Sequence, residues 1–164
     1  MRHLTLGALI VLCLAPVVQA QTADAKLMAP IQKFLESFNK GDVAGAAATH
    51  AAGAQLFIAD EFTPFLWRGP QAVQSWAEDL AREDKKRGIT DEHVTIGAAT
   101  RVETDGTAAY VIVPSVYTFK EKGVPMREAA QMTFVLQKGT GGWLIQGWTW
   151  TGPKPQKAGA SAKK

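Results

Sequence analysis

The spacing of apolar residues along this sequence changes near residue 93, and this change limits the folds that the chain can adopt. Before that residue, apolar side chains recur every three or four positions, which is typical of helices packed through one face. After it, apolar and polar side chains alternate, which is typical of half-buried strands. Because helical and extended segments are kept apart along the chain, we expect an α+β domain with helices on one face of a mainly antiparallel sheet.

Three helices and a short hairpin are expected before the change of period. In chain order the pattern predicts a helix over 27–38, a helix over 43–50, hairpin strands at 56–58 and 62–67, and a third helix after Gly69-Pro70. Asp42 is a suitable N-cap for the second helix, and proline is tolerated in the first turn of the third. The third helix should bury Trp76, while its charged end, 83–87, should face solvent.

Four longer strands are expected in the second half, separated by turn signals. They cover 93–102, 107–119, 127–137 and 143–151. Two of these stretches, 110–117 and 143–150, are apolar or aromatic on both faces. One face would meet the helices, and a second copy of the chain is the simplest cover for the other. The pattern therefore predicts a homodimer that associates through the sheet.

Residues 1–20 have the pattern of a secretory signal peptide. Arg2 is followed by an apolar run over 4–18, and Val18-Gln19-Ala20 fits a cleavage site for small residues. The run is short for a membrane span, which disfavours an uncleaved anchor, and Cys13 lacks the small preceding residue typical of lipid attachment. We therefore expect an exported protein, periplasmic or secreted, with no stable membrane insertion after cleavage. The cleaved chain would contain no cysteine, which excludes thiol chemistry.

The remaining chain divides into a folded domain, 21–152, and a lysine-rich tail, 153–164. The tail has four lysines, no acid and no periodicity, so we expect it to be disordered. The formal net charge is only +3, and the tail accounts for it. The folded domain therefore has no basic excess, and binding to nucleic acid is not expected.

Three motifs, in this order, resemble the nuclear transport factor 2-like superfamily, which also contains the SnoaL-like proteins. They are Phe38-Asn39-Lys40-Gly41-Asp42, then Phe65-Leu66-Trp67-Arg68-Gly69-Pro70-Gln71-Ala72-Val73, and finally Thr133-Phe134-Val135-Leu136-Gln137-Lys138 with Gly141-Gly142-Trp143-Leu144-Ile145. The resemblance implies a cone-shaped fold with three N-terminal helices on a curved sheet. The superfamily includes ketosteroid isomerase, scytalone dehydratase, limonene epoxide hydrolase and polyketide cyclases, besides non-catalytic binding proteins. Its members share a deep apolar pocket between sheet and helices. None of their sets of catalytic residues can be matched to positions of this sequence.

Asp60 and Glu61 are the first candidates for acid–base chemistry. They follow the first short strand and are flanked in sequence by aromatic residues, Phe57 and Phe62 among them. Burial among aromatic rings would raise the pKa of a carboxyl group towards neutrality, where it can exchange protons with a substrate. The alternative is that both residues occupy a solvated hairpin turn, where Asp is common.

His50 and Glu128 are two further candidates. His50 ends the second predicted helix, where it could reach a pocket or simply be stabilised by the helix dipole. Glu128 has the same strand parity as Met132 and should point inward, unless it pairs at the sheet edge with Arg127 or Lys120. Histidines and carboxylates are not grouped as a metal site requires, so no metal is expected.

Five amphipathic aromatic residues are candidates for ligand binding. They are Trp67, Tyr110, Tyr117, Trp148 and Trp150. The last two are separated by two positions on one strand, so they share a face. That pair favours a pocket wall or a dimer contact over packing against the helices.

The sequence favours an exported small-molecule-binding protein with an apolar, aromatic-lined pocket. The alternative is a cofactor-free isomerase, dehydratase or hydrolase that uses carboxylate or histidine side chains of that pocket. A third possibility, an interaction domain of the cell envelope, would have a filled interior without a cavity. No phosphate-binding loop or nucleotide fingerprint is present, since the glycines of 139–142 form a hairpin turn, so no cofactor is expected.

Overall fold

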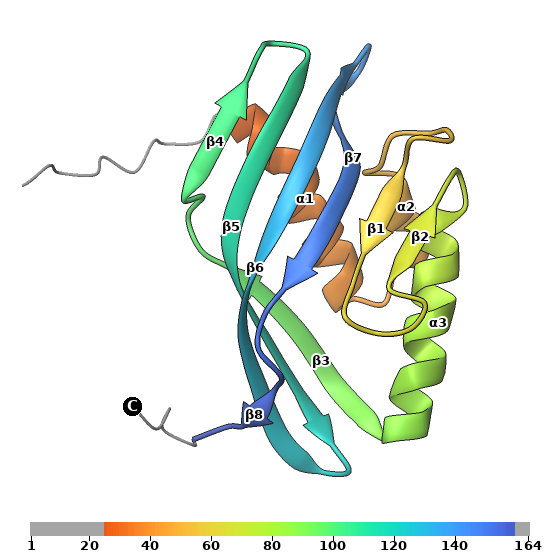
Figure 1. The fold of residues 1–164 in the computed structure, drawn as a ribbon, viewed down its shortest axis with the longest axis vertical. Coiled ribbons are helices and arrows are strands. Elements are labelled where there is room, and N and C mark those ends of the chain that lie inside the picture. Colours follow the sequence, from red (N-terminus) through yellow and green to blue (C-terminus); the bar gives the residue numbers. More distant parts are fainter. Residues whose placement is uncertain (1–24, 160–164) are drawn as a thin grey trace, which may run out of the picture.

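Three helices lie against one side of a single β-sheet in the computed structural model, which describes residues 25–159 (Figure 1). This arrangement confirms the predicted α+β class. The predicted signal peptide, residues 1–20, lies outside the described residues. Within 25–159, no helix is long and apolar enough to span a membrane.

The helices begin and end close to the predicted positions. They are α1 (Ala25–Asn39), α2 (Val43–Ala47) and α3 (Ala72–Arg87). The Asp42 side chain caps α2 by accepting a hydrogen bond from the Gly45 N–H at 2.8 Å. The second helix is shorter than predicted, because the chain at His50 already pairs with Ile145 of the sheet.

The sheet is mixed and contains eight strands within the described residues. They are β1 (Phe57–Ala59), β2 (Leu66–Arg68), β3 (Ile89–Ile96), β4 (Arg101–Thr104), β5 (Ala108–Glu121), β6 (Val124–Gly139), β7 (Gly142–Thr151) and β8 (Gln156–Lys157). Their order is β2-β1-β7-β6-β5-β3, with β4 also pairing with β5 and β8 with β6. Only the β1–β7 pair is parallel.

The strand predicted over 93–102 is in fact two strands, β3 and β4, and this corrects the sequence interpretation. Both pair with β5, but the pairing stops on either side of Pro114. Proline has no N–H to donate to a neighbouring strand, so the ladder is interrupted opposite it. There the chain turns at Gly97, whose N–H donates to the Pro114 carbonyl.

The described part of the lysine-rich tail, 153–159, is not irregular as expected. Its residues Gln156 and Lys157 form β8 and pair with Arg127 and Met126 of β6. The physical reason is that β6 extends beyond the point where β7 ends, which leaves a free edge. The tail fills that edge, and the segment between β7 and β8 therefore runs alongside the lower part of the sheet (Figure 1).

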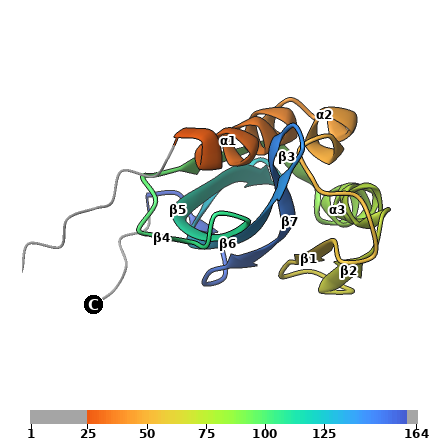
Figure 2. The ribbon, with the colours of Figure 1, turned by 90° about the horizontal axis from the view of Figure 1, so that it is seen from above.

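The core lies between the helices and the inner face of the sheet, and Trp148 of β7 is at its centre. Its ring is 5.5 Å from that of Phe34 on α1 and 5.1 Å from that of Trp76 on α3, measured between centroids. Phe34 also meets Phe134 of β6 at 6.4 Å. Figure 2 shows the sheet curving beneath α1, with α3 beside it. The Trp148 contacts therefore hold both long helices to the same strand.

The end of α1 is tied to β3 by one side chain. Asn39 donates from Nδ2 to the Val94 carbonyl at 2.9 Å and accepts the Val94 N–H on Oδ1 at 2.8 Å. This pair of bonds satisfies both backbone groups of Val94 on its outer edge. Phe38, next to Asn39 on α1, and Val94 both line the cavity described below.

Candidate functional site

A cavity of about 600 Å³ lies between α1, α3 and the inner face of the sheet. Its aromatic lining comes from Phe34, Phe38, Phe62, Trp76, Tyr117, Trp148 and Trp150. The volume is within the range of small-molecule sites. A filled interior, as an interaction domain would have, is therefore excluded.

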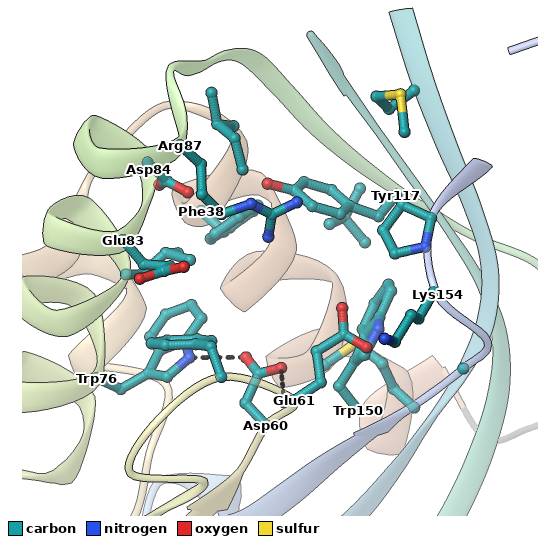
Figure 3. A pocket seen from close by; sticks show the side chains of 18 of the residues that line it. Phe38, Asp60, Glu61, Trp76, Glu83, Asp84, Arg87, Tyr117, Trp150 and Lys154 are labelled. Carbon is teal, nitrogen blue, oxygen red and sulfur yellow. Dashed lines mark hydrogen bonds between the residues drawn. The ribbon is translucent and has the colours of Figure 1, made fainter. Parts of the chain in front are cut away.

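Asp60 lies in this cavity, at the point where the chain leaves β1. Its Oδ2 accepts a hydrogen bond from Trp76 Nε1 at 2.8 Å, and its Oδ1 accepts the Glu61 N–H at 2.7 Å (Figure 3). Burial raises the pKa of Asp60 to about 6, although both hydrogen bonds favour the charged form. Asp60 can therefore take up or release a proton close to neutral pH.

Glu61 and Glu128 form a carboxyl pair beside Asp60. Glu61 reaches into the cavity towards Trp150 and Lys154 (Figure 3). Although Glu61 is among the exposed residues, the partial loss of water around its carboxyl group raises its pKa to about 7, and the negative charge of Glu128 contributes to the shift. A proton on Glu61 can hydrogen-bond to Glu128, so near neutrality the pair shares one proton, held on Glu61.

Glu128 itself is buried on β6, 1% exposed, and points inward as its strand parity predicted. Its Oε1 accepts a hydrogen bond from Trp150 Nε1 at 2.7 Å, whereas its Oε2 has no hydrogen-bond partner among the described residues. A side chain at Gly152 would overlap this carboxylate, so the backbone after β7 covers it. Burial raises the pKa of Glu128. The alternative ion pair with Lys120 does not form, because Lys120 pairs with Asp91.

The charged end of α3 lines the cavity, which corrects the expectation that 83–87 faces solvent. Glu83, Asp84 and Arg87 are all part of its wall. They follow Trp76 and Leu80 at helical spacing, so they lie on the same helix face. The helical spacing of these residues from Trp76 and Leu80 is visible in the sequence. The prediction placed them in solvent because they are charged.

Arg87 reaches into the cavity towards Tyr117 (Figure 3). Its Nε is 3.1 Å from Glu121 Oε1, and its guanidinium lies 5.9 Å from the centre of the Phe119 ring. The hydrogen bond to Glu121 raises the pKa of Arg87, so its charge is fixed. This cation is thus already paired within the wall.

A second carboxyl pair, Asp84 and Glu92, lies on the α3 side of the cavity. Burial raises the pKa of Asp84 to about 7, and the charge of Glu92 adds to the shift. Glu92 also accepts a hydrogen bond from the Tyr117 hydroxyl. Sequence reasoning missed this pair, because it placed the charged end of α3, which contains Asp84, in solvent.

His50 is not part of the cavity wall, contrary to its candidacy as an acid–base residue. Its Nδ1 donates to the Ala46 carbonyl at 2.9 Å, and its Nε2 accepts from Trp148 Nε1 at 3.2 Å. Burial lowers the pKa of His50 to about 4. The ring is therefore neutral, 7% exposed and bonded at both nitrogens, so it serves the core.

The five candidate aromatic residues divide between the cavity and other places. Tyr117, Trp148 and Trp150 line the cavity, although Trp148 also packs against both long helices, which the sequence interpretation had disfavoured. Trp67 is buried and donates to Asp79 Oδ2 at 2.7 Å, outside the cavity. Tyr110 is 38% exposed on the opposite face of the sheet. It lies seven residues before Tyr117, and an odd separation on one strand places two side chains on opposite faces.

Within the described residues, no group of three or more potential ligand side chains could hold a metal ion. The cavity offers carboxyl groups, indole N–H groups and one paired guanidinium instead. What this arrangement can do chemically is bind a small molecule and exchange protons with it.

The SnoaL-like domain family matches residues 27–148, and the chain belongs to this family. No curated protein matches the chain by sequence. The fold, with its mixed sheet, is that of the nuclear transport factor 2-like proteins. Proteins of this fold include isomerases, dehydratases and ring-modifying enzymes.

Three solved structures illustrate the likeness. A ketosteroid isomerase-like protein from Erwinia carotovora atroseptica is 21% identical, over 80% of this chain and 96% of that one, with a TM-score of 0.63. A nuclear transport factor 2-like protein from Salmonella enterica serovar Typhimurium is 16% identical, over 85% and 95%, with a TM-score of 0.64. A hexachlorocyclohexane dehydrochlorinase is 14% identical, over 83% and 92%, with a TM-score of 0.65. At these identities the likeness establishes the fold alone.

The raised pKa of Asp60 predicts a specific pH dependence of stability. Its pKa is 3.8 in the exposed state and about 6 in the folded chain, so the folded chain binds the proton more tightly. Asp60 should therefore lower the free energy of unfolding as pH rises from about 4 to 6. Asp60→Asn lacks this effect, so its stability relative to the parent should increase by up to about 3 kcal/mol across that window, measured by urea unfolding.

The matched control is Glu36→Gln, which removes one carboxylate from the exposed face of α1. Its unfolding free energy should follow that of the parent at every pH. A constant difference between Asp60→Asn and the parent from pH 4 to pH 7 would contradict the burial of this carboxyl group.

Proposed function

We propose that the cavity binds a small, largely apolar molecule and catalyses proton transfer on it without a cofactor. The observation that carries the proposal is the position of Asp60 and Glu61 on consecutive residues in an aromatic cavity, with pKa values of about 6 and 7. Between these values one group is ionised while the other still holds a proton. A base and an acid are then available at the same place.

The chemistry that fits such a pair is isomerisation or elimination next to a carbonyl group. The Asp60 carboxylate takes a proton from the adjacent carbon, and the C–H electron pair moves into the carbonyl to give an enolate. The proton on Glu61 exchanges its hydrogen bond to Glu128 for one to the enolate oxygen, whose charge it stabilises. In a β,γ-unsaturated ketone the anion is a dienolate, and return of the proton from Asp60 to the γ carbon moves the C=C bond into conjugation and completes an isomerisation. The aromatic walls exclude water and contact the apolar part of the substrate.

Binding without turnover would use the same cavity. The aromatic lining alone supports either role. Turnover is favoured because an ordinary binding wall has no need of acids that titrate near neutrality, and buried carboxyl groups destabilise the fold when they ionise.

Two further proposals concern the assembly and location of the protein. We propose a homodimer through the outer face of the sheet, where Tyr110 is 38% exposed opposite Val135, next to Ile112. Tyr110, Ile112 and Val135 form an apolar part of this face, and the Arg101 guanidinium lies 5.7 Å from the centre of the Tyr110 ring. We also propose export, on the strength of the pattern in residues 1–20 alone.

The catalytic proposal predicts deuterium exchange. A panel of cyclic ketones in D₂O should include substrates that gain deuterium next to the carbonyl when the protein is present, as followed by NMR. Asp60→Asn should reduce this rate about 100-fold or more, because a general base is lost. The pH profile should rise as Asp60 ionises, near 6, and fall as Glu61 loses its proton, near 7.

Glu36→Gln, on the exposed face of α1, should exchange at the parent rate. The proposal fails if no ketone exchanges faster than in protein-free solution, or if Asp60→Asn is as fast as the parent.

The dimer proposal predicts that Tyr110→Asp dissociates the assembly, because it places a charge within an apolar contact. Native mass spectrometry should give a dimer for the parent and a monomer for this variant. Lys40→Asp, at the exposed end of α1, should remain dimeric. A monomeric parent chain would refute the proposed interface.

A further inference from the structure

We infer that the cavity selects a ligand that carries a positive charge on an aromatic or cyclic body, such as an aryl ketone with an amino group. The inference rests on the proposed small-molecule function of this cavity and adds the chemical class of the ligand. It is supported by the excess of acidic side chains in the cavity wall, by Glu128 Oε2, which has no hydrogen-bond partner among the described residues, and by the positions of the indole rings.

Acidic side chains outnumber basic ones around the cavity. The wall contains Asp60, Glu61, Glu83, Asp84 and Glu121, whereas its only basic residues are Arg87 and Lys154. Arg87 is paired with Glu121, and Lys154 is an exposed residue on the side of the cavity where Glu61 and Trp150 lie (Figure 3). Glu92 and Glu128 add two carboxyl groups that interact with the wall. Even with one proton shared in each carboxyl pair, the cavity keeps a negative charge, and its low-dielectric walls strengthen the field.

Glu128 Oε2 lacks a donor whenever Glu61 is ionised, although Trp150 still donates to Oε1 of the same carboxylate. Glu128 is 1% exposed, and its Oε2 has no hydrogen-bond partner among the described residues. A buried carboxylate oxygen without a donor is unfavourable, as are two adjacent anions. A proton on Glu61 removes both difficulties. An ammonium group at the same place would do so as well, since it supplies N–H donors and a positive charge together.

The indole rings complete a surface suited to organic cations. Trp76 donates its N–H to Asp60, and Trp150 donates its N–H to Glu128, so each ring lies beside an acid. The ring of Tyr117 meets that of Trp150 edge to face, at 6.2 Å. Aromatic faces next to carboxylates attract ammonium groups, and the same surface repels anions. A neutral ligand would gain only the apolar contact.

Three indole compounds of similar size provide the test: tryptamine, which is cationic, tryptophol, which is neutral, and indole-3-propionate, which is anionic. Their dissociation constants are measured by calorimetry on the full chain at pH 8 and pH 5.5. At pH 8 tryptamine should bind about tenfold or more tightly than tryptophol, and indole-3-propionate should bind most weakly. The alkyl amine stays protonated at both pH values.

The preference should depend on pH, because protons compete with the cation for Asp60 and Glu61. At pH 5.5 both carboxyl groups are largely protonated, so the advantage of tryptamine over tryptophol should shrink about tenfold. Glu61→Gln should reduce that advantage at pH 8, while Glu36→Gln on α1 should leave it unchanged. Lys154→Gln should increase it, because one competing cation is removed from the cavity wall.

Equal or tighter binding of tryptophol or indole-3-propionate at pH 8 would overturn the inference and leave the proposed proton transfer standing. An advantage that persists in Glu61→Gln, or the absence of tryptamine binding, would also overturn it. Loss of deuterium exchange together with an intact preference for tryptamine would instead refute the catalytic proposal alone.

Discussion

Two hydrogen bonds from indole N–H groups to buried carboxyl groups organise this molecule. Trp76 bonds to Asp60, and Trp150 bonds to Glu128, at 2.8 and 2.7 Å. These bonds join α3 to the β1–β2 loop and β7 to β6, so they close the cavity from both sides. They also keep acidic groups inside an aromatic cavity that would otherwise exclude them, because an indole donor partly replaces the water lost on burial. The rest of the fold can be understood as the framework that holds these two pairs in place.

Strand β7 connects that framework to the site. Trp148 packs between α1 and α3 and donates to His50, whereas Trp150, two residues later on the same face, reaches the cavity and Glu128. A change in the position of β7 would therefore move the core and the acid pair together. The neutrality of His50 follows from the same arrangement, since burial in the core lowers its pKa even though the hydrogen bond to the Ala46 carbonyl favours the charged form. His50 therefore helps to position β7 through its hydrogen bond with Trp148. The candidates for proton exchange are the carboxyl groups of the cavity.

The fold class, the three helices and the inward direction of Glu128 could be predicted because they depend on local period and parity. Other features required knowledge of distant partners. The break between β3 and β4 is set by Pro114 on the neighbouring strand, and the role of His50 by Trp148, ninety-eight residues away. The charged end of α3 was misjudged for a different reason: Arg87 continues the buried stripe, but a charged residue at such a position is usually solvated. In the structure Arg87 lines the cavity and is paired with Glu121.

The proposed chemistry requires Asp60 and Glu61 to titrate near neutrality inside an aromatic cavity. Carbon-detected NMR of the side-chain carboxyl groups, followed from pH 3 to pH 9, measures this directly for each residue. We expect a pKa of about 6 for Asp60 and about 7 for Glu61, and a lower value for Glu61 once Glu128→Gln removes the neighbouring charge. Titration of both residues at their ordinary values, 3.8 and 4.5, would show that these carboxyl groups are solvated and that the cavity has no acid–base pair.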